Sequence, residues 1–316
     1  MNYGIGYKGS KNKLAERIVN LFPPADNFYD LFCGGCSITH RALLTNKFKN
    51  YYINDLDPLM PKLFLDAIHG KYKNETRWIS REDFKKLKDT DGYVKVCWSF
   101  GNNGNVYLYD EKLEPYKKAI HYAVMFNDCT QLKTFLNADY SFLDSCKNFH
   151  QRKIKLQRFL FNSGIAKGSP LESCVDVMEI SQNINRLEAL ERLQSLEALE
   201  RLQRFGTTSC GYDEVKINPN SVIYCDIPYK NTDGYNGIDF DFDKFYSWCK
   251  EQKEPVFISS YEMPLEHFEP VDIINHRCTL AAEVNNAVTE KVFIPKHQVD
   301  LYRKLQPQPS LFADMW

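Results

Sequence analysis

The sequence predicts an α/β fold built on a mostly parallel sheet, and three observations lead to this prediction. Short apolar runs of strand-forming residues recur at residues 28–32, 51–55, 222–225 and 255–260. Segments with helical spacing of apolar residues separate several of these runs, an alternation that is typical of parallel sheets. Two of the runs end at, or directly before, an aspartate. Because ligands bind outside the carboxyl ends of such strands, the pattern indicates a binding site at one edge of the sheet.

Length and charge indicate how the chain is divided. It has 316 residues and a formal net charge of -1, which allows one large domain or two of ordinary size. Residues 71–167 contain 18 Lys and Arg against 11 Asp and Glu, a balance of +7, whereas the remainder has a balance of −8. A basic middle suits a nucleic-acid-facing insert, although a solvated lysine-rich surface gives the same count. We predict one domain from residues 1–70 and 170–316, with an insert at 71–169.

Ten cysteines occur in the chain, without a signal peptide or an apolar run of about 20 residues. We therefore expect a cytoplasmic protein with free thiols and no membrane segment. Cys33 and Cys36 have C-x-x-C spacing, but no second such pair and no neighbouring histidine pair completes a zinc site. The sequence thus predicts no metal centre.

An aromatic residue and a lysine precede the first helical segment. Tyr7 and Lys11 flank a Gly-Ser pair, and a helix is expected from residue 12 to residue 21, where two prolines end it. The two side chains suit a small ligand held near the start of the helix. An ordinary loop followed by a helix has the same sequence.

A glycine-rich turn follows the strand at residues 28–32 and leads into a helix that begins at Ser37. This arrangement cradles nucleotides, because glycine lets the backbone approach and the helix N-terminus offers free N–H groups. About 20 residues later a second strand ends at Asp55, the spacing at which an acid reaches a ribose hydroxyl. Asp55 also suits a turn before Pro58, so both interpretations stand at this point.

The middle of the chain is predicted to be mainly helical with one hairpin. Helices are expected at residues 58–69 and after Ser80, which begins a capping box. Aromatic residues surround an Asn/Gly-rich turn between residues 93 and 109, which predicts two short strands joined as a hairpin. Five cations fall on a predicted helix over residues 147–158. These side chains suit contacts with bases and phosphates, or alternatively a small core with a charged surface.

A duplication follows the basic segment. Residues 187–194 and 196–203 are both L-E-A-L-E-R-L-Q, a repeat of period nine. Nine residues rotate a helix by about half a turn beyond whole turns, so a straight helix points the two copies in opposite directions. This excludes a coiled-coil seam, and we interpret the duplication as a helical spacer without chemistry of its own.

The stretch S-V-I-Y-C-D-I-P-Y at residues 221–229 carries the strongest chemical signal. A buried strand delivers Asp226, Pro228 and Tyr229 to the end of the sheet. Pro228 fixes the backbone, and Tyr229 offers a ring on which an extruded base stacks, a contact worth about 1–3 kcal/mol. An Asp-x-Pro after a strand is also a common turn opener.

The same tetrapeptide suits methyl transfer from S-adenosylmethionine to an amine. The exocyclic amine of adenine is a poor nucleophile because its lone pair is delocalised into the ring. Asp226 and the backbone carbonyl of Ile227 are suited to accept its two hydrogens, which draws the nitrogen toward a nucleophilic geometry.

A polar loop at residues 230–239 follows and contains Tyr235 and Asn236, as a loop that covers a substrate does. Three further elements are expected: a helix over residues 241–248 and strands near residues 271–274 and 292–294. These elements complete the alternation of strands and helices.

By these motifs and their order, the chain resembles the DNA adenine methyltransferases of the Dam type, and more closely the phage and prophage members of that family. The resemblance covers most of the chain and rests on G-Y-K-G-S-K, D-L-F-C-G-G-C-S, Y-I-N-D and V-I-Y-C-D-I-P-Y. It implies a Rossmann-like sheet with an inserted target-recognition domain, S-adenosylmethionine as methyl donor and double-stranded DNA as substrate. Residues 71–169 are then the part that reads DNA.

The resemblance also implies roles for single residues. The donor-binding residues are expected to be Tyr7, Lys11, Asp30, Phe32, Gly34, Asp55, Tyr212 and Asp226. The catalytic residues are expected to be Asp226, Ile227, Pro228 and Tyr229, and the loop residues Tyr235 and Asn236 are expected to contact the substrate.

Two positions depart from the family pattern. Cys36 stands where the last glycine of the loop is usual, and a side chain at this position is expected to hinder close approach of a ligand to the backbone. Ile227 replaces the usual first proline, but the group needed at that position is a main-chain carbonyl, which isoleucine also has.

Other functions remain open from the sequence. An amine of cytosine, or an RNA substrate, also fits the tetrapeptide, because its residues read only an amine and a π-face. A catalytically impaired module that binds nucleic acid is a second class, and a dinucleotide oxidoreductase, suggested by the glycine turn and Asp55, is a third. The motifs leave the recognised DNA sequence and the oligomeric state undetermined.

Overall fold

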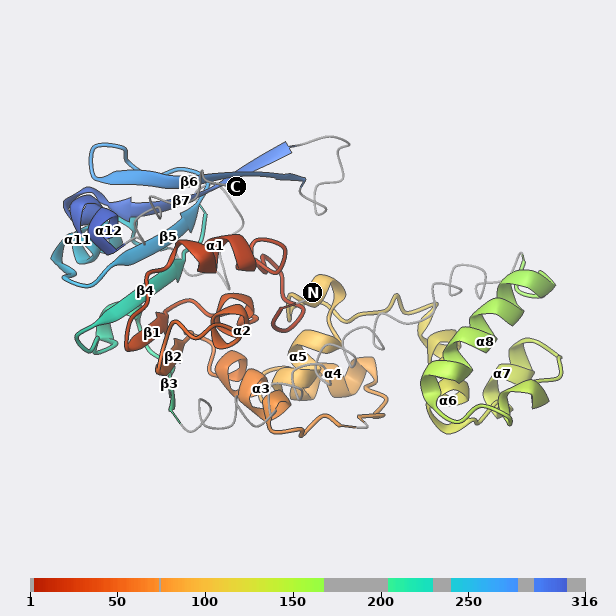
Figure 1. Cartoon of the computed structure of the whole chain (residues 1–316). Coiled ribbons are helices and arrows are strands. Elements are labelled where there is room, and N and C mark those ends of the chain that lie inside the picture. Colours follow the sequence, from red (N-terminus) through yellow and green to blue (C-terminus); the bar gives the residue numbers. More distant parts are fainter. Residues whose placement is uncertain (1–2, 74, 168–203, 230–239, 278–286, 306–316) are drawn as a thin grey trace. The chain divides into compact units, whose positions relative to one another are not determined.

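The computed structural model describes five stretches of the chain: residues 3–73, 75–167, 204–229, 240–277 and 287–305. The chain forms two compact units (Figure 1). The first unit comprises Met1–Ile5, Gly9–His69 and Arg192–Trp316, and the second comprises Gly6–Lys8 and Gly70–Glu191. The first unit is therefore assembled mainly from the two ends of the chain and the second from its middle.

Within the described residues, the first unit contains a seven-stranded sheet with the order β3-β2-β1-β4-β5-β7-β6. The strands are β1 Asn27–Asp30, β2 Asn50–Asn54, β3 Phe205–Thr208, β4 Ser221–Asp226, β5 Val256–Ser260, β6 Phe268–Arg277 and β7 Ala287–Pro295. The five strands from β3 to β5 pair in parallel, whereas β7 is antiparallel to both β5 and β6. This confirms the predicted mostly parallel α/β sheet.

Helices lie between the parallel strands along the chain. The helices of this unit are α1 Ala15–Leu21, α2 Ser37–Leu43, α3 Leu59–Ile68, α11 Phe242–Glu251 and α12 Val299–Leu305. The start of α11 has a clear cause, since the Asp241 side chain accepts the Lys244 N–H at 2.9 Å. α2 connects β1 to β2, and α11 lies between β4 and β5, as parallel pairing requires.

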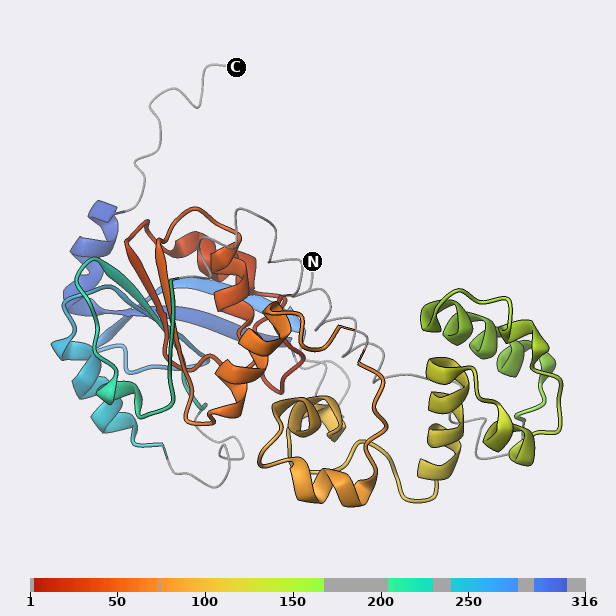
Figure 2. The same ribbon diagram turned by 90° about the horizontal axis from the view of Figure 1, so that it is seen from below.

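Side chains of both sheet faces are buried. On one face, Phe22 at the end of α1 packs against Phe28, Tyr224 and Phe257 of three neighbouring strands. On the other face, Tyr29, Ile223 and Ile258 belong to a core cluster with Phe245 of α11. Figures 1 and 2 show α1 and α2 on one side of the sheet and α11 on the other. Each fully buried large apolar side chain contributes about 1.5–3 kcal/mol, so the sheet is held from both sides.

The register of the sheet aligns the ends of its central strands. Asp30, the last residue of β1, lies opposite Ile53 of β2 and Tyr224 of β4. Because the three strands are parallel, the residues that follow them emerge at one edge. Asp30, Asp55 and Asp226 therefore share the carboxyl edge of the sheet.

The short edge strand β3 was missed by the sequence analysis. Its sequence, F-G-T-T, contains a glycine, and glycine weakens the local signal for a strand. The structure gives that glycine a reason: a Cβ at Gly206 would come within 2.5 Å of the Tyr52 ring on the neighbouring strand. Close packing between strands, which a single segment does not reveal, determines the residue here.

The described part of the second unit is mainly helical, as predicted for the insert. Its helices are α4 Arg81–Leu87, α5 Gly92–Cys97, α6 Glu114–Phe126, α7 Thr130–Phe135 and α8 Phe149–Ser163. Side chains cap three of them: Ser80 accepts the Asp83 N–H, Asp91 accepts the Tyr93 N–H, and Asn148 accepts the Gln151 N–H. The cap predicted at Ser80 is confirmed.

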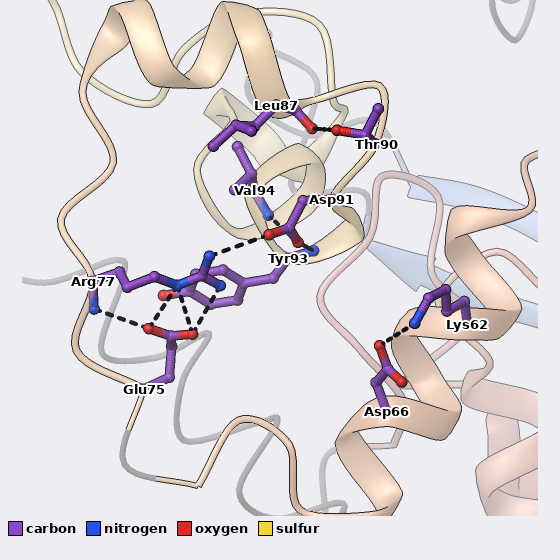
Figure 3. Close-up of polar contacts among 9 residues, drawn as sticks. All are labelled: Lys62, Asp66, Glu75, Arg77, Leu87, Thr90, Asp91, Tyr93 and Val94. Carbon is purple, nitrogen blue, oxygen red and sulfur yellow. Dashed lines mark hydrogen bonds and ion pairs between the residues drawn. The ribbon is translucent and has the colours of Figure 1, made fainter.

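A helix replaces the first strand of the hairpin predicted over residues 93–109. Gly92–Cys97 forms α5, because the Asp91 side chain caps it by accepting the Tyr93 N–H at 2.9 Å (Figure 3). Arg77 binds Asp91 at 3.3 Å, and its guanidinium lies 5.1 Å from the centre of the Tyr93 ring. The prediction of this strand was wrong, since an aspartate directly before a helical segment is a strong N-cap.

The predicted reversal of the chain does occur after α5. The Phe100 N–H donates to the Val106 carbonyl at 2.8 Å, and Ser99 and Tyr107 form one antiparallel bridge. Two glycines in the turn have positive φ, a conformation that favours glycine. The hairpin is thus reduced to a tight turn with few ladder contacts.

Some predictions fall on residues outside the described stretches. These are the duplicated segment at residues 187–203 and the loop residues Tyr235 and Asn236. Among the described cysteines, Cys33 and Cys36 carry free thiols. In the parts of the chain that the structure describes, no helix combines the length and the apolar character needed to cross a membrane.

Candidate active site

A buried ion pair lies at the carboxyl end of β4. The Lys11 Nζ is 2.7 Å from Asp226 Oδ1 and 2.9 Å from Asp226 Oδ2, although the two residues are 215 positions apart. The Lys11 side chain is 7% exposed and that of Asp226 is 21% exposed. Each charge therefore depends on the other, because an enclosed charge without a partner costs several kcal/mol.

The electrostatics of this pair depend on burial and on its neighbours. Burial lowers the pKa of Lys11, but attraction by Asp226 and by Glu290 outweighs it, so that the pKa lies above its usual value. Burial raises the pKa of Asp226, and the lysine beside it only partly offsets that rise. Lys11 is thus an ammonium at neutral pH. Because the pKa of Asp226 is raised, its carboxylate is more basic than one in water and accepts hydrogen bonds more strongly.

Tyr229 is held by contacts around its ring and at its hydroxyl. The Lys11 Nζ lies 4.9 Å from the ring centre, within range of a cation–π contact. The ring of Tyr261, directly after β5, lies 4.2 Å away centre to centre. The Tyr229 hydroxyl donates to Glu290 Oε1 of β7 at 2.7 Å. The ring consequently has a fixed position beside the ion pair.

The two residues between Asp226 and Tyr229 differ in burial. Ile227 is 2% exposed and belongs to the same core cluster as Ile223 and Cys225 of β4. Pro228 is partly exposed. Ile227, which departs from the family pattern, therefore anchors the backbone of the tetrapeptide in the core. Pro228, the next residue, fixes its own φ through its ring.

The turn after β1 bends through left-handed backbone. Gly34 has φ +43° and Cys36 has φ +54°, and the Gly34 N–H donates to Asp55 Oδ2 at 2.8 Å. Cys36 is fully buried and precedes α2 as its N-cap residue. A non-glycine residue with positive φ is uncommon, so Cys36 adopts the backbone conformation that a glycine would favour.

Asp30 is a buried carboxyl group at the end of β1. It is 1% exposed, and the Thr39 hydroxyl donates to its Oδ2 at 2.6 Å. Its Oδ1 is buried and has no hydrogen-bond partner among the described residues. Burial raises its pKa to about 7, and repulsion from Asp226 and Asp55 adds to that effect. An unpaired polar atom at this depth suits a ligand that brings its own donor.

Two aromatic rings stack beside each other, one from the residue directly before the glycine turn and one from the segment after β3. Phe32 and Tyr212 are stacked with ring centres 5.5 Å apart and planes at 28°. Tyr212 also contacts Phe245 and Trp248 of α11 edge-on. Both rings remain partly exposed, so they offer an apolar surface to a planar ligand.

A comparison with protein families identifies this arrangement. A family model for the D12 class N6 adenine-specific DNA methyltransferases matches residues 7–251. The chain belongs to this family. It is therefore an S-adenosylmethionine-dependent enzyme that methylates adenine in DNA, which confirms the function and the donor expected from the sequence and excludes the oxidoreductase interpretation. A search among curated proteins found no match.

The methyltransferase structure brings together most of the residues expected at the site. The first unit contains Lys11, Asp30, Phe32, Gly34, Asp55, Tyr212, Asp226, Ile227, Pro228 and Tyr229. Tyr7 belongs to the second unit, in which the Lys8 N–H donates to the Asn102 carbonyl at 3.4 Å. The carboxylates of three strand ends, Asp30, Asp55 and Asp226, belong to this unit together with Lys11, which pairs with Asp226.

One residue of the Y-I-N-D motif has a role that the sequence analysis missed. Asn54 is 2% exposed; its amide donates to the carbonyls of Leu31 and Cys210 and accepts from the Thr208 hydroxyl at 2.8 Å. It thus ties the ends of β1, β2 and β3 together, and its partner Cys210 lies two residues before Tyr212. The signal available in the sequence was an asparagine at the end of a run of strand-forming residues.

Glu290 is the second residue that the sequence analysis missed in this methyltransferase. It lies in the strand run V-T-E-K-V-F-I, where it alternates with Val292 and Ile294. An acid at an apolar position of an alternating strand is informative, because such groups are almost never buried unless paired. The pairing with Tyr229, 61 residues away, appears only in the fold.

Proposed function

We propose that adenine methylation takes place at the carboxyl end of β4, on residues 226–229. The observation that supports this most is the Lys11–Asp226 ion pair at 2.7 Å. A mostly buried ion pair adds little to stability, because desolvation offsets the attraction of its charges. At the open end of a parallel strand, such a pair suits a reaction better than packing.

The task of these residues is to make the adenine amine nucleophilic. An oxygen of Asp226 accepts one amine hydrogen and the Ile227 carbonyl accepts the other, which draws the nitrogen lone pair out of the ring. Lys11 contacts both oxygens of Asp226, yet each carboxylate oxygen has about two lone-pair sites, so acceptor capacity remains for the substrate. Tyr229 supplies the ring on which the extruded base stacks.

The residues around the glycine turn fit S-adenosylmethionine. The buried Oδ1 of Asp30, without a partner in the described stretches, suits the amino group of the donor. Asp55 keeps lone pairs for a ribose hydroxyl, and the partly exposed rings of Phe32 and Tyr212 suit an adenine. When bound, S-adenosylmethionine supplies an electrophilic methyl group on a positively charged sulfur.

We further propose that the substrate is double-stranded DNA and that residues 71–169 recognise it. Residues 71–167 carry a charge balance of +7, and α8 presents an exposed Arg158. Duplex DNA is densely charged, so exposed cations supply much of its binding energy. Extrusion of the target adenine costs a few kcal/mol of unstacking, which contacts in the pocket recover. We expect the enzyme in the cytoplasm, where bacterial and phage DNA is accessible.

The test is methyl incorporation from labelled S-adenosylmethionine into three substrates of one sequence: duplex DNA, single-stranded DNA and RNA. Digestion to nucleosides and mass analysis identify the product. We expect 6-methyladenine from duplex DNA, formed at least about 100-fold more slowly by the Asp226→Asn variant. Label in methylcytosine, or label confined to RNA, would contradict the proposal, and equal activity of Asp226→Asn would contradict the proposed site.

A further inference from the structure

Glu290 is a buried carboxylate to which the proposed chemistry assigns no role. It is 2% exposed on β7, opposite Ile274 of β6, and it shares a strand face with the fully buried Val292. It also lies beyond the family-matched residues 7–251. A charge at an apolar strand position is costly to bury, so its contacts indicate what it is for.

The contacts of Glu290 lead to the reacting end of β4. Its Oε1 accepts a hydrogen bond from the Tyr229 hydroxyl at 2.7 Å. The Tyr229 ring in turn lies under the Lys11 ammonium at 4.9 Å, and Lys11 binds Asp226. An uninterrupted series of polar contacts therefore joins β7 to the carboxylate that is proposed to hold the amine.

The charge of Glu290 also acts on Lys11 directly. Burial lowers the pKa of Lys11, and attraction by Asp226 and then by Glu290 raises it. Lys11 thus pairs directly with Asp226 and is also attracted by the charge of Glu290. We expect the loss of Glu290 to strengthen the pairing of Lys11 with Asp226, which makes Asp226 a weaker acceptor for an amine hydrogen.

We propose that Glu290 is a positioning residue for methyl transfer, which holds the Tyr229 ring through its hydroxyl and balances the charge of Lys11. This inference rests on the proposed role of residues 226–229. Glu290 does not touch the substrate; it acts through Tyr229 and Lys11.

Three substitutions separate the hydrogen bond from the charge. Glu290→Gln keeps an acceptor for the Tyr229 hydroxyl and removes the charge, Glu290→Met removes both at similar volume, and Tyr229→Phe removes the hydroxyl alone. Glu266→Gln, at an exposed position of the same unit, is the matched control.

The experiment measures the single-turnover rate of 6-methyladenine formation at saturating duplex DNA and donor, together with the DNA dissociation constant and the melting temperature of each variant. We expect Glu290→Met to slow transfer about 10- to 100-fold, the loss typical of a hydrogen bond to a charged group. Glu290→Gln should recover part of that loss. DNA affinity should change less than about 3-fold, because phosphate contacts dominate it.

The double variant Tyr229→Phe with Glu290→Met tests whether the two residues act together. We expect the fold-loss in rate of the double variant to be smaller than the fold-losses of the two single variants multiplied together, because both substitutions remove the same hydrogen bond. Tyr229→Phe should slow transfer even if Glu290→Met fails to fold. The inference would be overturned if the fold-losses of the two single variants multiplied in the double variant. It would also be overturned if the transfer rate of Glu290→Met lay within about 2-fold of the wild-type rate. An inactive wild-type enzyme would instead contradict the proposed function.

Discussion

The two units of this methyltransferase differ in the burial of their charged side chains. In the first unit, Lys11, Asp30 and Glu290 are all less than 10% exposed. In the second, every described Lys, Arg, Asp and Glu is at least partly exposed, including those on the basic helix α8. Burying a charge costs several kcal/mol of desolvation free energy, so buried charges are expected where they interact with a ligand. Exposing a cation costs little, and exposed cations attract phosphate groups.

This difference leads to different expectations for mutations in the two units. Substitutions among the buried charges should change the rate of transfer or the stability of the fold, with little effect on DNA affinity. Substitutions among the exposed cations should change DNA affinity and its salt dependence, with little effect on the rate once DNA is saturating.

The largest effect is expected for Asp226→Asn. This variant keeps the shape of the side chain but loses the carboxylate, so the amine loses its strongest acceptor. We expect the transfer rate to fall about 10²- to 10³-fold, the cost of removing one electrostatic contact in an active site. The rate is measured in a single turnover with labelled donor. Asp243→Asn on the exposed side of α11 is the control and should leave the rate unchanged.

Lys11→Met should destabilise the first unit, because it leaves Asp226 enclosed without its cation. Breaking a buried pair costs about 3–5 kcal/mol, and since Asp226 keeps 21% exposure we expect about 2–3 kcal/mol in the free energy of unfolding. Urea unfolding measures it. A variant as stable as wild type would show that water, rather than Lys11, solvates Asp226.

Asp30 should make stability depend on pH. Its pKa in the fold, about 7, lies above its ordinary value of 3.8, so the fold holds the proton more tightly than the unfolded chain does. The stabilisation is complete below pH 3.8 and is lost progressively as pH rises from 3.8 to 7, by about 4 kcal/mol over that whole range, since the two pKa values differ by about 3 units. Asp30→Asn should remove this slope. Unfolding in urea at pH 5 and pH 8 compares the two proteins; parallel curves would contradict the prediction.

The smallest effect is expected for Arg158→Ala in the second unit. Loss of one exposed cation should weaken duplex binding a few-fold and reduce the dependence of log affinity on log salt by about one. The measurement is a DNA titration at several salt concentrations. Lys250→Ala, an exposed cation of α11, is the matched control and should leave the salt dependence unchanged.

Local sequence signals were sufficient for the strands of the described sheet other than β3, and for the acids at the edge of that sheet. Runs of strand formers predicted four of the strands that flank the site, and Asp55 and Asp226 were expected because each directly follows such a run. The capping serine Ser80 was found in the same way. Each of these features depends on residues within one segment.

Features that depend on distant partners were missed or wrong. The hydrogen bond between Tyr229 and Glu290 joins the segment after β4 to β7, across 61 positions in the chain. The helix α5 was mistaken for a strand because aromatic residues suit both structures, and only the cap by Asp91 decides between them. Asn54 went unnoticed because its role is to join three strand ends.

One measurement tests the division of labour between the units most directly. Single-turnover rate at saturating DNA and DNA dissociation constant are determined together for Asp226→Asn and Arg158→Ala. The division predicts a rate loss of about 100-fold or more with nearly unchanged affinity for Asp226→Asn, and the reverse pattern for Arg158→Ala. A full transfer rate in Asp226→Asn would contradict the central claim that the carboxylate at the end of β4 carries out the chemistry.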